Sequence, residues 1–133
     1  MWASIFFERS ENMGKKKTKI VGKISSSICK ANNISCFSGY DIVQSLGLIS
    51  HVNKHVNNFI SVDSFNKTLA NVDKVISSPY FVYYDPIKNS LRYYKKLDEF
   101  VCVVVNILND YSFVSTIYPV NKKTIDKLKN KNK

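Results

Sequence analysis

Glycine, proline and cysteine are scarce in this chain of 133 residues, which holds four glycines, three prolines and three cysteines. The glycines do not cluster, so there is no phosphate-binding glycine loop, which argues against a nucleotide-dependent kinase or dehydrogenase. The Gly-x-Ser-x-Gly motif of serine hydrolases is also missing. The cysteines are odd in number and lack Cys-x-x-Cys spacing. That pattern is typical of packing thiols in a reducing compartment, not of a disulfide framework.

Acidic residues are few, with 10 Asp and Glu against 20 Lys and Arg, a net charge of +10. Paired acids for metal-dependent nuclease chemistry are therefore scarce, and we expect neither a metal nor another cofactor. The acids that follow the strand-like runs fall where turns are expected: Asp85, Asp98, Glu99 and Asp110. The basic balance favours a phosphate-rich partner, although many lysines lie near the two ends, where they often form only solvated tails.

Long hydrophobic runs are absent, since no segment approaches the roughly 18 to 20 apolar residues of a membrane span. Residues 1–12 make a poor secretion signal, and Met13-Gly14 resembles a second start. We therefore expect no membrane association and a cytoplasmic location, in a bacterial cell or in a cell into which the protein is delivered. The length fits a single domain over 19–128, with an N-terminal extension over 1–18 and a basic tail over 129–133.

What the sequence does have is a strand-rich region from Pro79 to Pro119. Four runs rich in β-branched and aromatic residues are separated by turn-forming segments, at 80–84, 91–96, 100–105 and 113–118. This pattern predicts an antiparallel meander. The third run has almost no polar position, so we expect a central strand covered on both faces. The other three mix apolar and polar residues, so each should have one solvent-facing side.

The region before the meander predicts mainly helices. We expect a strand over 19–24, a short helix over 25–31 capped by Ser25 or Ser26, and a weak strand over 34–37. Apolar residues at steps of three and four predict an amphipathic helix over 41–59, or two shorter helices separated at Gly47, the second starting near Leu48. A helix over 65–77 follows, capped by Asp63 or Ser64, and a short basic helix after Val120 carries Ile125 and Leu128 on one side. The fold class is α+β, with N-terminal helices packed on a four-stranded antiparallel sheet and an extra N-terminal strand.

His51 and His55, the only histidines, are four residues apart on a predicted helix, a spacing that points both rings to one side. The spacing also suits zinc, but Val52 stands where a metalloprotease has its glutamate, and no third ligand is evident. Imidazoles can instead act as general base and acid on a ribose 2′-hydroxyl and a leaving 5′-oxygen. The alternative is two surface histidines without a chemical role.

Two further pairs of polar residues alternate on predicted strands. Tyr93 and Lys95 share one face of their strand, and Thr116 and Tyr118 share one face of theirs. Tyrosine can stack on a base or bind a phosphate, and lysine can neutralise charge on a pentacoordinate phosphate. The same residue types are also common in strands without any function.

The order of these blocks resembles a known superfamily. The resemblance rests on His51-Val52-Asn53-Lys54-His55, on the Tyr93 and Thr116 strands, and on Asn121-Lys122-Lys123 after the last strand. Together they are similar to the phage-associated nuclease domains of the Barnase–EndoU–colicin–RelE superfamily, over roughly residues 19–128. The chain departs from that pattern at Lys54, Val56 and Ser115.

The resemblance implies a metal-independent ribonuclease, often a toxin of phages or mobile elements, with a few helices packed on a four-stranded antiparallel sheet. RNA is then the expected partner, with tRNA as one candidate, together with an acidic immunity or antitoxin protein. The implied catalytic residues are His51, His55, Lys95, Thr116 and Tyr118. The residues expected to bind substrate are Lys54, Arg92, Tyr93, Ser115 and Lys122. The alternative is a non-catalytic basic protein of a mobile element that uses the same fold to bind RNA or to inhibit a host defence nuclease.

Overall fold

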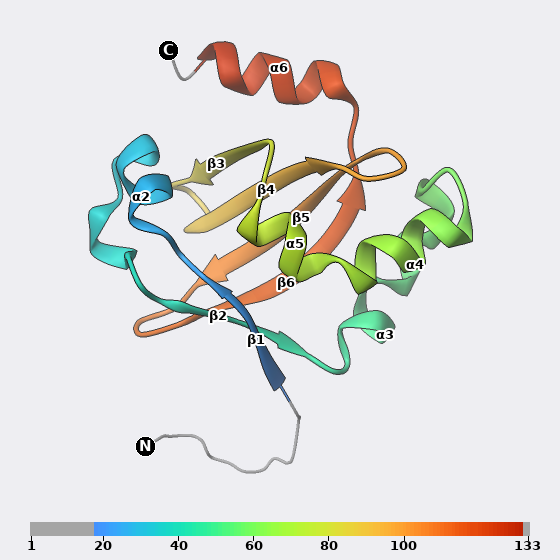
Figure 1. Cartoon of the computed structure of the whole chain (residues 1–133), viewed down its shortest axis with the longest axis horizontal. Coiled ribbons are helices and arrows are strands. Elements are labelled where there is room, and N and C mark those ends of the chain that lie inside the picture. Colours follow the sequence, from blue (N-terminus) through green and yellow to red (C-terminus); the bar gives the residue numbers. More distant parts are fainter. Residues whose placement is uncertain (1–17, 132–133) are drawn as a thin grey trace.

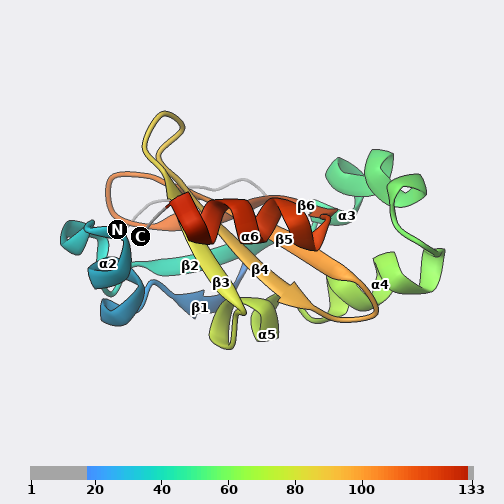
Figure 2. The same cartoon turned by 90° about the horizontal axis from the view of Figure 1, so that it is seen from above.

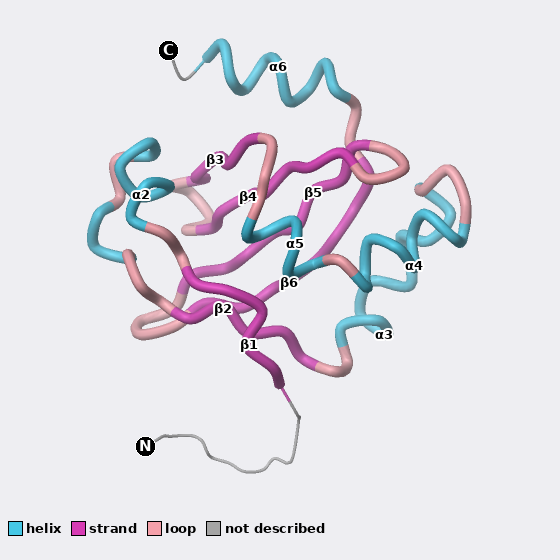
Figure 3. The backbone as a smooth tube through the Cα atoms, in the orientation of Figure 1, coloured by secondary structure: helices cyan, strands magenta, loops and turns pink. Residues whose placement is uncertain are grey.

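The computed structural model describes residues 18–131, which form an α+β fold around a six-stranded sheet (Figure 1). The strands lie in the order β1-β2-β6-β5-β4-β3. Their bounds are β1 Thr18–Lys23, β2 Asp41–Ser45, β3 Phe81–Asp85, β4 Ser90–Lys96, β5 Phe100–Ile107 and β6 Ser112–Pro119. The helices are α2 Ser26–Asn32, α3 Leu48–Val52, α4 Val62–Ala70, α5 Val72–Ser77 and α6 Lys122–Lys131, with 3-10 helices η1 Ser35–Phe37 and η2 Asn53–Asn58. Figure 3 shows the strands at the centre and the helices around them.

The predicted meander is confirmed as the antiparallel strands β3, β4, β5 and β6. The first turn forms after Asp85, whose Oδ1 accepts hydrogen bonds from the amides of Ile87 and Lys88, and it ends at Asn89 in a left-handed conformation with φ 49°. The expected central strand is also confirmed. In β5, both Cys102 and Val103 are fully buried although they point to opposite faces of the sheet.

The extra N-terminal strand is confirmed as β1, but the helix expected from Asp41 is wrong over its first five residues, which form β2. β2 pairs antiparallel with β1 and parallel with β6, so the sheet is mixed. Its apolar residues suited a helix by spacing alone. Pairing with β1 and with β6, which lie far away in the sequence, decides the outcome.

The helices differ from the expected ones at their boundaries. α2 begins as predicted, with Ser25 accepting a hydrogen bond from the amide of Ile28. α3 begins at Leu48, as one of the two expected arrangements had it. The single helix expected over 65–77 is instead α4 and α5, which meet at Asn71, and α4 is capped by Ser61 rather than by Asp63 or Ser64. The weak strand expected over 34–37 is wrong, because residues 35–37 form η1.

The sheet has two different faces. One, the core face, carries Leu91, Tyr93, Val103 and Ile117 into the main hydrophobic core, where helices including α5 pack on it. The residues of the other, the outer face, are Phe81, Tyr83, Arg92, Tyr94, Cys102, Val104, Thr116 and Tyr118. Figure 2 shows α5 and α6 lying apart on different sides of the strands.

The C-terminal helix α6 covers one part of the outer face. Ile125 is fully buried against Tyr94 and Cys102, and Leu128 is partly buried beside them, so the expected apolar side of this helix is confirmed. The Lys129 ammonium lies 4.4 Å from the centre of the Tyr80 ring. The helix continues to Lys131. The expected N-terminal extension, apart from residue 18, lies outside the described residues.

Asn32, at the end of α2, satisfies backbone groups on the outer edge of β3. Its side-chain oxygen accepts a hydrogen bond from the amide of Tyr84 at 3.0 Å, and its side-chain nitrogen donates to the carbonyl of Val82 at 3.4 Å. A neighbouring strand would bond to the same two groups. This side chain therefore protects one edge of the sheet.

Candidate functional site

The uncovered part of the outer face is organised around Arg92. The strand registers place Tyr83, Arg92, Val104 and Thr116 in one row across β3, β4, β5 and β6, and all four are partly exposed. Strands lie about 4.8 Å apart, so the backbones of Arg92 and Thr116 are roughly 10 Å from each other. This spacing leaves room for the guanidinium and the hydroxyl to approach one ligand from two sides.

Arg92 is held in place by its neighbours and remains charged. Its Nη2 donates to Oδ2 of Asp85 at 2.9 Å, and its guanidinium carbon lies 5.8 Å from the centre of the Tyr83 ring. Burial alone would lower the pKa of Arg92, but the nearby phenols of Tyr118 and Tyr94 and the carboxylate of Asp85 raise it overall. The outer face therefore carries a fixed cation with 28% of its side chain exposed.

The phenols beside Arg92 stay protonated at neutral pH. Burial raises the pKa of Tyr94 to about 12, and burial also raises the pKa of Tyr118, which lies beside the Cys102 thiol. A protonated phenol donates a hydrogen bond and can deliver a proton to a strongly basic oxygen. Tyr94 is fully buried beneath α6, so the neutral donor that this face offers beside the Arg92 cation is the partly exposed phenol of Tyr118.

A cleft of about 510 Å³ borders the same face at β6. Polar side chains line it from three directions: His51 from α3, Asn106 from β5 and Ser115 from β6. The remaining lining residues are Ser45, Gly47, Leu48, Phe113 and Val114. Asn106 lies two residues from Val104 and therefore points to the outer face. His51, which is exposed, thus stands at the margin of the face that carries Arg92.

Ser115 reaches this cleft because β6 contains a bulge. Val104 pairs with Thr116 while the next residue, Val105, pairs with Val114, so Ser115 is the extra residue. A bulge changes the direction of side chains locally, which is why bulges are frequent beside active sites. The structure therefore brings together two of the predicted site residues, His51 and Ser115.

The two histidines do not share a face as their spacing predicted. The chain changes from α-helix to 3-10 helix at Asn53, and His55 lies in η2. Each residue turns by about 100° in an α-helix and by about 120° in a 3-10 helix, so the rings diverge by roughly a quarter turn. Of the two, His51 lines the cleft and His55 does not.

The expectation that Tyr93 and Lys95 both face solvent is wrong for Tyr93, whereas Lys95 is partly exposed. Tyr93 is fully buried in the main core, and its hydroxyl has no hydrogen-bond partner among the described residues. Lys95 points to the same core face, where its ammonium donates to the carbonyl of Ser78 at 2.6 Å. Neither residue can meet His51 over a common surface, because the outer face belongs to the alternate residues Arg92 and Tyr94.

The other predicted site residues lie in different places. Thr116 and Tyr118 share the outer face with Arg92. Lys54 is exposed in η2. Lys122 is exposed at the start of α6 and pairs with Asp126 at 3.1 Å. The structure thus joins Arg92, Thr116 and Tyr118 into one group and leaves Lys54 and Lys122 outside it.

Sequence reasoning missed four residues around Arg92 and the cleft: Tyr83, Asp85, Tyr94 and Asn106. Pairing could have found them, because a short turn fixes which residues of β3 and β4 face each other. In that register, Thr116 and Tyr118 lie on the same face of the sheet as Arg92 and Tyr94, and not on the face of Tyr93 and Lys95. Within residues 18–131 there is no group of three His, Cys, Asp or Glu side chains placed to hold a metal ion, and no helix long and apolar enough to span a membrane.

The fold defines a small α+β domain with a mixed sheet, in which helices cover the core face and α6 covers only part of the outer face. A family model described as phage-Barnase-EndoU-ColicinE5/D-RelE like nuclease3 matches residues 18–127. Because the match spans most of the chain, the protein belongs to this family of phage-associated nucleases, and the resemblance stated from the sequence is confirmed. Comparison with curated proteins and comparison with solved structures gave no match.

Proposed function

We propose that the protein is a metal-independent endoribonuclease that cleaves RNA, with tRNA as the first substrate to try. The observation that carries the proposal is the position of Arg92, a fixed cation on the outer face beside Thr116 and Tyr118, with the His51 cleft at the margin of the same face. Membership of a nuclease family supplies the general chemistry. The arrangement supports a scissile phosphate bound at Arg92.

In the proposed reaction, the ribose 2′-oxygen attacks the adjacent phosphorus while the bond from phosphorus to the 5′-oxygen breaks. His51 accepts the proton of the 2′-hydroxyl, since it is the imidazole that lines the cleft. The phenol of Tyr118, kept protonated by burial, donates a proton to the leaving 5′-oxygen. The products are a 2′,3′-cyclic phosphate and a free 5′-hydroxyl.

Arg92 and Thr116 act on the phosphate itself. Negative charge grows on the two non-bridging oxygens in the pentacoordinate transition state, and a guanidinium can donate two parallel hydrogen bonds to them. The Thr116 hydroxyl lies two strands from Arg92 in the same row, on the other side of Val104, and donates a further hydrogen bond to the phosphate. Arg92 therefore takes the role that the sequence assigned to Lys95.

Basic residues elsewhere contribute affinity without selectivity. The protein carries a net charge of +10, and Lys123, Lys127 and Lys131 lie exposed along α6. Cations that contact phosphates release counterions, so RNA affinity should fall steeply as salt increases.

The test is cleavage of total tRNA in the presence of EDTA by the full chain and its variants. We expect cleavage that survives chelation, leaves cyclic phosphate ends and disappears in His51→Ala. His55→Ala is the matched control and should keep most of the activity, because His55 does not line the cleft. Intact RNA after incubation with folded wild-type protein would contradict the proposal.

A second candidate is a non-catalytic binding protein of a mobile element that binds RNA or inhibits a host defence nuclease. One observation favours this candidate: only one imidazole, that of His51, lines the cleft, whereas general acid–base catalysis commonly uses two such groups. A stoichiometric complex with RNA or with a protein, unchanged in His51→Ala and without RNA cleavage, would select this candidate.

A further inference from the structure

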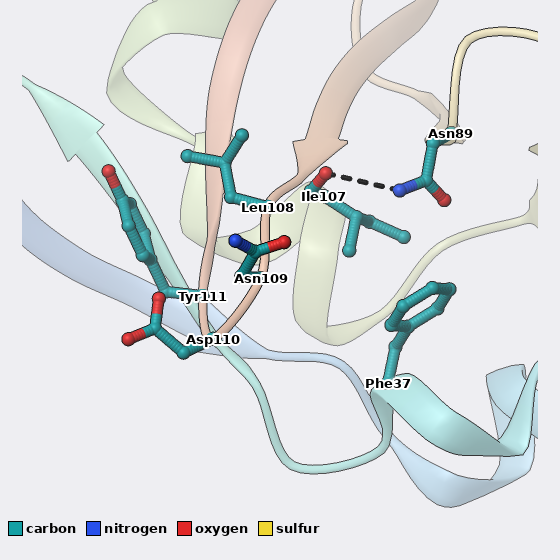
Figure 4. Close-up of a pocket in the computed structure, with 7 residues that line it drawn as sticks. All are labelled: Phe37, Asn89, Ile107, Leu108, Asn109, Asp110 and Tyr111. Carbon is teal, nitrogen blue, oxygen red and sulfur yellow. Dashed lines mark hydrogen bonds between the residues drawn. The ribbon is translucent and has the colours of Figure 1, made fainter.

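A second pocket, the hairpin-tip pocket, lies at the end of the sheet and has no role in the proposed reaction. It has a volume of about 500 Å³ and forms between the β5–β6 loop, the β3–β4 turn and η1 (Figure 4). Its lining residues are Phe37, Asn89, Ile107, Leu108, Asn109, Asp110 and Tyr111. Figure 4 shows the Phe37 ring on one side of the opening and Asn109 on the other.

The frame of this pocket is fixed by hydrogen bonds. The amide of Leu108 donates to the carbonyl of Tyr111 at 2.8 Å, which closes the loop, and the hydroxyl of Tyr40 donates to the carbonyl of Asn109 at 2.6 Å. Asn89 accepts at Oδ1 from Tyr84 and donates from Nδ2 to the carbonyl of Ile107. A pocket held in this way is organised before a ligand arrives, which lowers the entropic cost of binding.

The chemistry of the lining suits a flat, neutral and aromatic ligand. Phe37 offers a ring, and Leu108 and Tyr111 add exposed apolar surface, each with 41% of its area exposed. No lysine or arginine lines the pocket, and Asp110 would repel a phosphate. The pocket therefore favours a nucleobase over the phosphate of a nucleotide.

Two polar side chains can read the edge of a base. The carboxamide of Asn109 offers a donor and an acceptor, which match the amino group and the ring nitrogen of adenine in one bidentate contact. The carboxylate of Asp110 accepts hydrogen bonds only and repels carbonyl oxygens. Guanine, cytosine and uracil all carry carbonyl oxygens and adenine carries none, so adenine is the base that these two side chains favour.

The hairpin-tip pocket and the His51 cleft are lined by residues that are neighbours in the sequence of one β-hairpin. Asn106 and Phe113 line the cleft, while Ile107 and Tyr111 of the same hairpin line the pocket. Asn106 points to the outer face and Ile107 to the core face, so an RNA strand that bends over the tip of this hairpin would reach both sites. We propose, building on the proposed ribonuclease function, that the hairpin-tip pocket binds an unpaired adenine of the RNA substrate and thereby sets the sequence preference of cleavage.

The test is a titration of the full chain with 5′-AMP and with 5′-IMP, followed through the backbone amide NMR signals of residues 108–111. The two nucleotides share ribose and phosphate, but IMP carries a carbonyl where AMP carries the amino group. We expect saturable shifts with AMP and binding at least about tenfold weaker with IMP, because the Asp110 carboxylate can accept a hydrogen bond from the amino group of AMP but repels the carbonyl oxygen of IMP. Equal affinities, or no shifts with AMP, would overturn the proposal.

Variants make the assignment specific. Asn109→Ala should weaken AMP binding about tenfold or more, and Asn66→Ala, an exposed change on α4, should leave it unchanged. His51→Ala should also bind AMP normally, because His51 does not line this pocket. AMP binding without RNA cleavage would refute the ribonuclease function and keep the pocket, whereas cleavage that ignores adenine and is unchanged in Asn109→Ala would refute the pocket alone.

Discussion

Asp85 and Arg92 form a partly buried ion pair that joins two neighbouring strands, with 2.9 Å between Oδ2 and Nη2. Asp85 also accepts hydrogen bonds from the amides of Ile87 and Lys88 at its other oxygen, Oδ1. One carboxylate therefore fixes both the β3–β4 turn and the cation of the proposed site. Asp85→Asn keeps an oxygen for those amides and removes the charge opposite Arg92. We expect it to lower the free energy of unfolding by about 1–3 kcal/mol, measured by urea denaturation.

The matched control for that change is Asp98→Asn. Asp98 pairs with Lys67 at 2.8 Å, but both side chains are well exposed, at 41% and 50%. Exposed pairs contribute about 0 to 1 kcal/mol, so this variant should lose little stability. Equal losses in the two variants would show that burial of the Arg92 pair adds nothing.

Arg92 and Lys95 should respond differently to substitution in RNA cleavage. Arg92→Ala should reduce the cleavage rate by about 100-fold or more, as expected when a group that stabilises transition-state charge is removed. Lys95→Ala should retain nearly all activity, because that ammonium bonds to Ser78 on the core face. Initial rates of tRNA cleavage check both variants. If only Lys95→Ala lost activity, the scissile phosphate would have to bind on the core face and not at Arg92.

Tyr93 and Tyr84 provide a test of an unpaired hydroxyl. The Tyr93 hydroxyl is buried and has no partner among residues 18–131, so Tyr93→Phe should leave the urea midpoint unchanged or raise it. The Tyr84 hydroxyl donates to Asn89 at 2.7 Å, so Tyr84→Phe should cost about 1 kcal/mol. A large loss of stability in Tyr93→Phe would point to a hydrogen bond that this conformation lacks.

Alkaline pH should destabilise the fold through its buried phenols. Burial raises the pKa of Tyr93, Tyr94 and Tyr118 above the ordinary value of 10, to about 12 for Tyr94. The folded state then holds protons that the unfolded state has released. Stability should therefore be unaffected below about pH 10, and each such tyrosine should reduce it by about 1.4 kcal/mol per pH unit up to its folded pKa.

The measurement is the absorbance of tyrosinate during a titration to high pH, in parallel with circular dichroism. The chain has eight tyrosines. We expect Tyr93, Tyr94 and Tyr118, whose pKa burial raises, to ionise only as the fold is lost. Ionisation of all eight in one step while the circular dichroism remains native would contradict the described burial.

Local sequence patterns predicted the meander, the doubly buried β5 and the cap at Ser25, because turns, composition and capping act within a few residues. They assigned the wrong face of β4, since Arg92-Tyr93-Tyr94-Lys95 places one aromatic and one basic residue on each side. Which side packs against the core depends on helices far along the chain. The same limit explains β2, which pairing defines, and the histidines, which a change of helix type at Asn53 separates.

The carboxamide of Asn32 has a consequence for the protein in a crowded cell. The unpaired backbone groups of an exposed edge strand can bond to a strand of a second molecule, and repetition of that step builds fibres. Here one amide group already fills the two bonding positions at Val82 and Tyr84, and it comes from a helix that cannot be displaced without exposing Cys29 and its apolar surroundings. Self-association through that margin is thereby blocked by a single uncharged side chain.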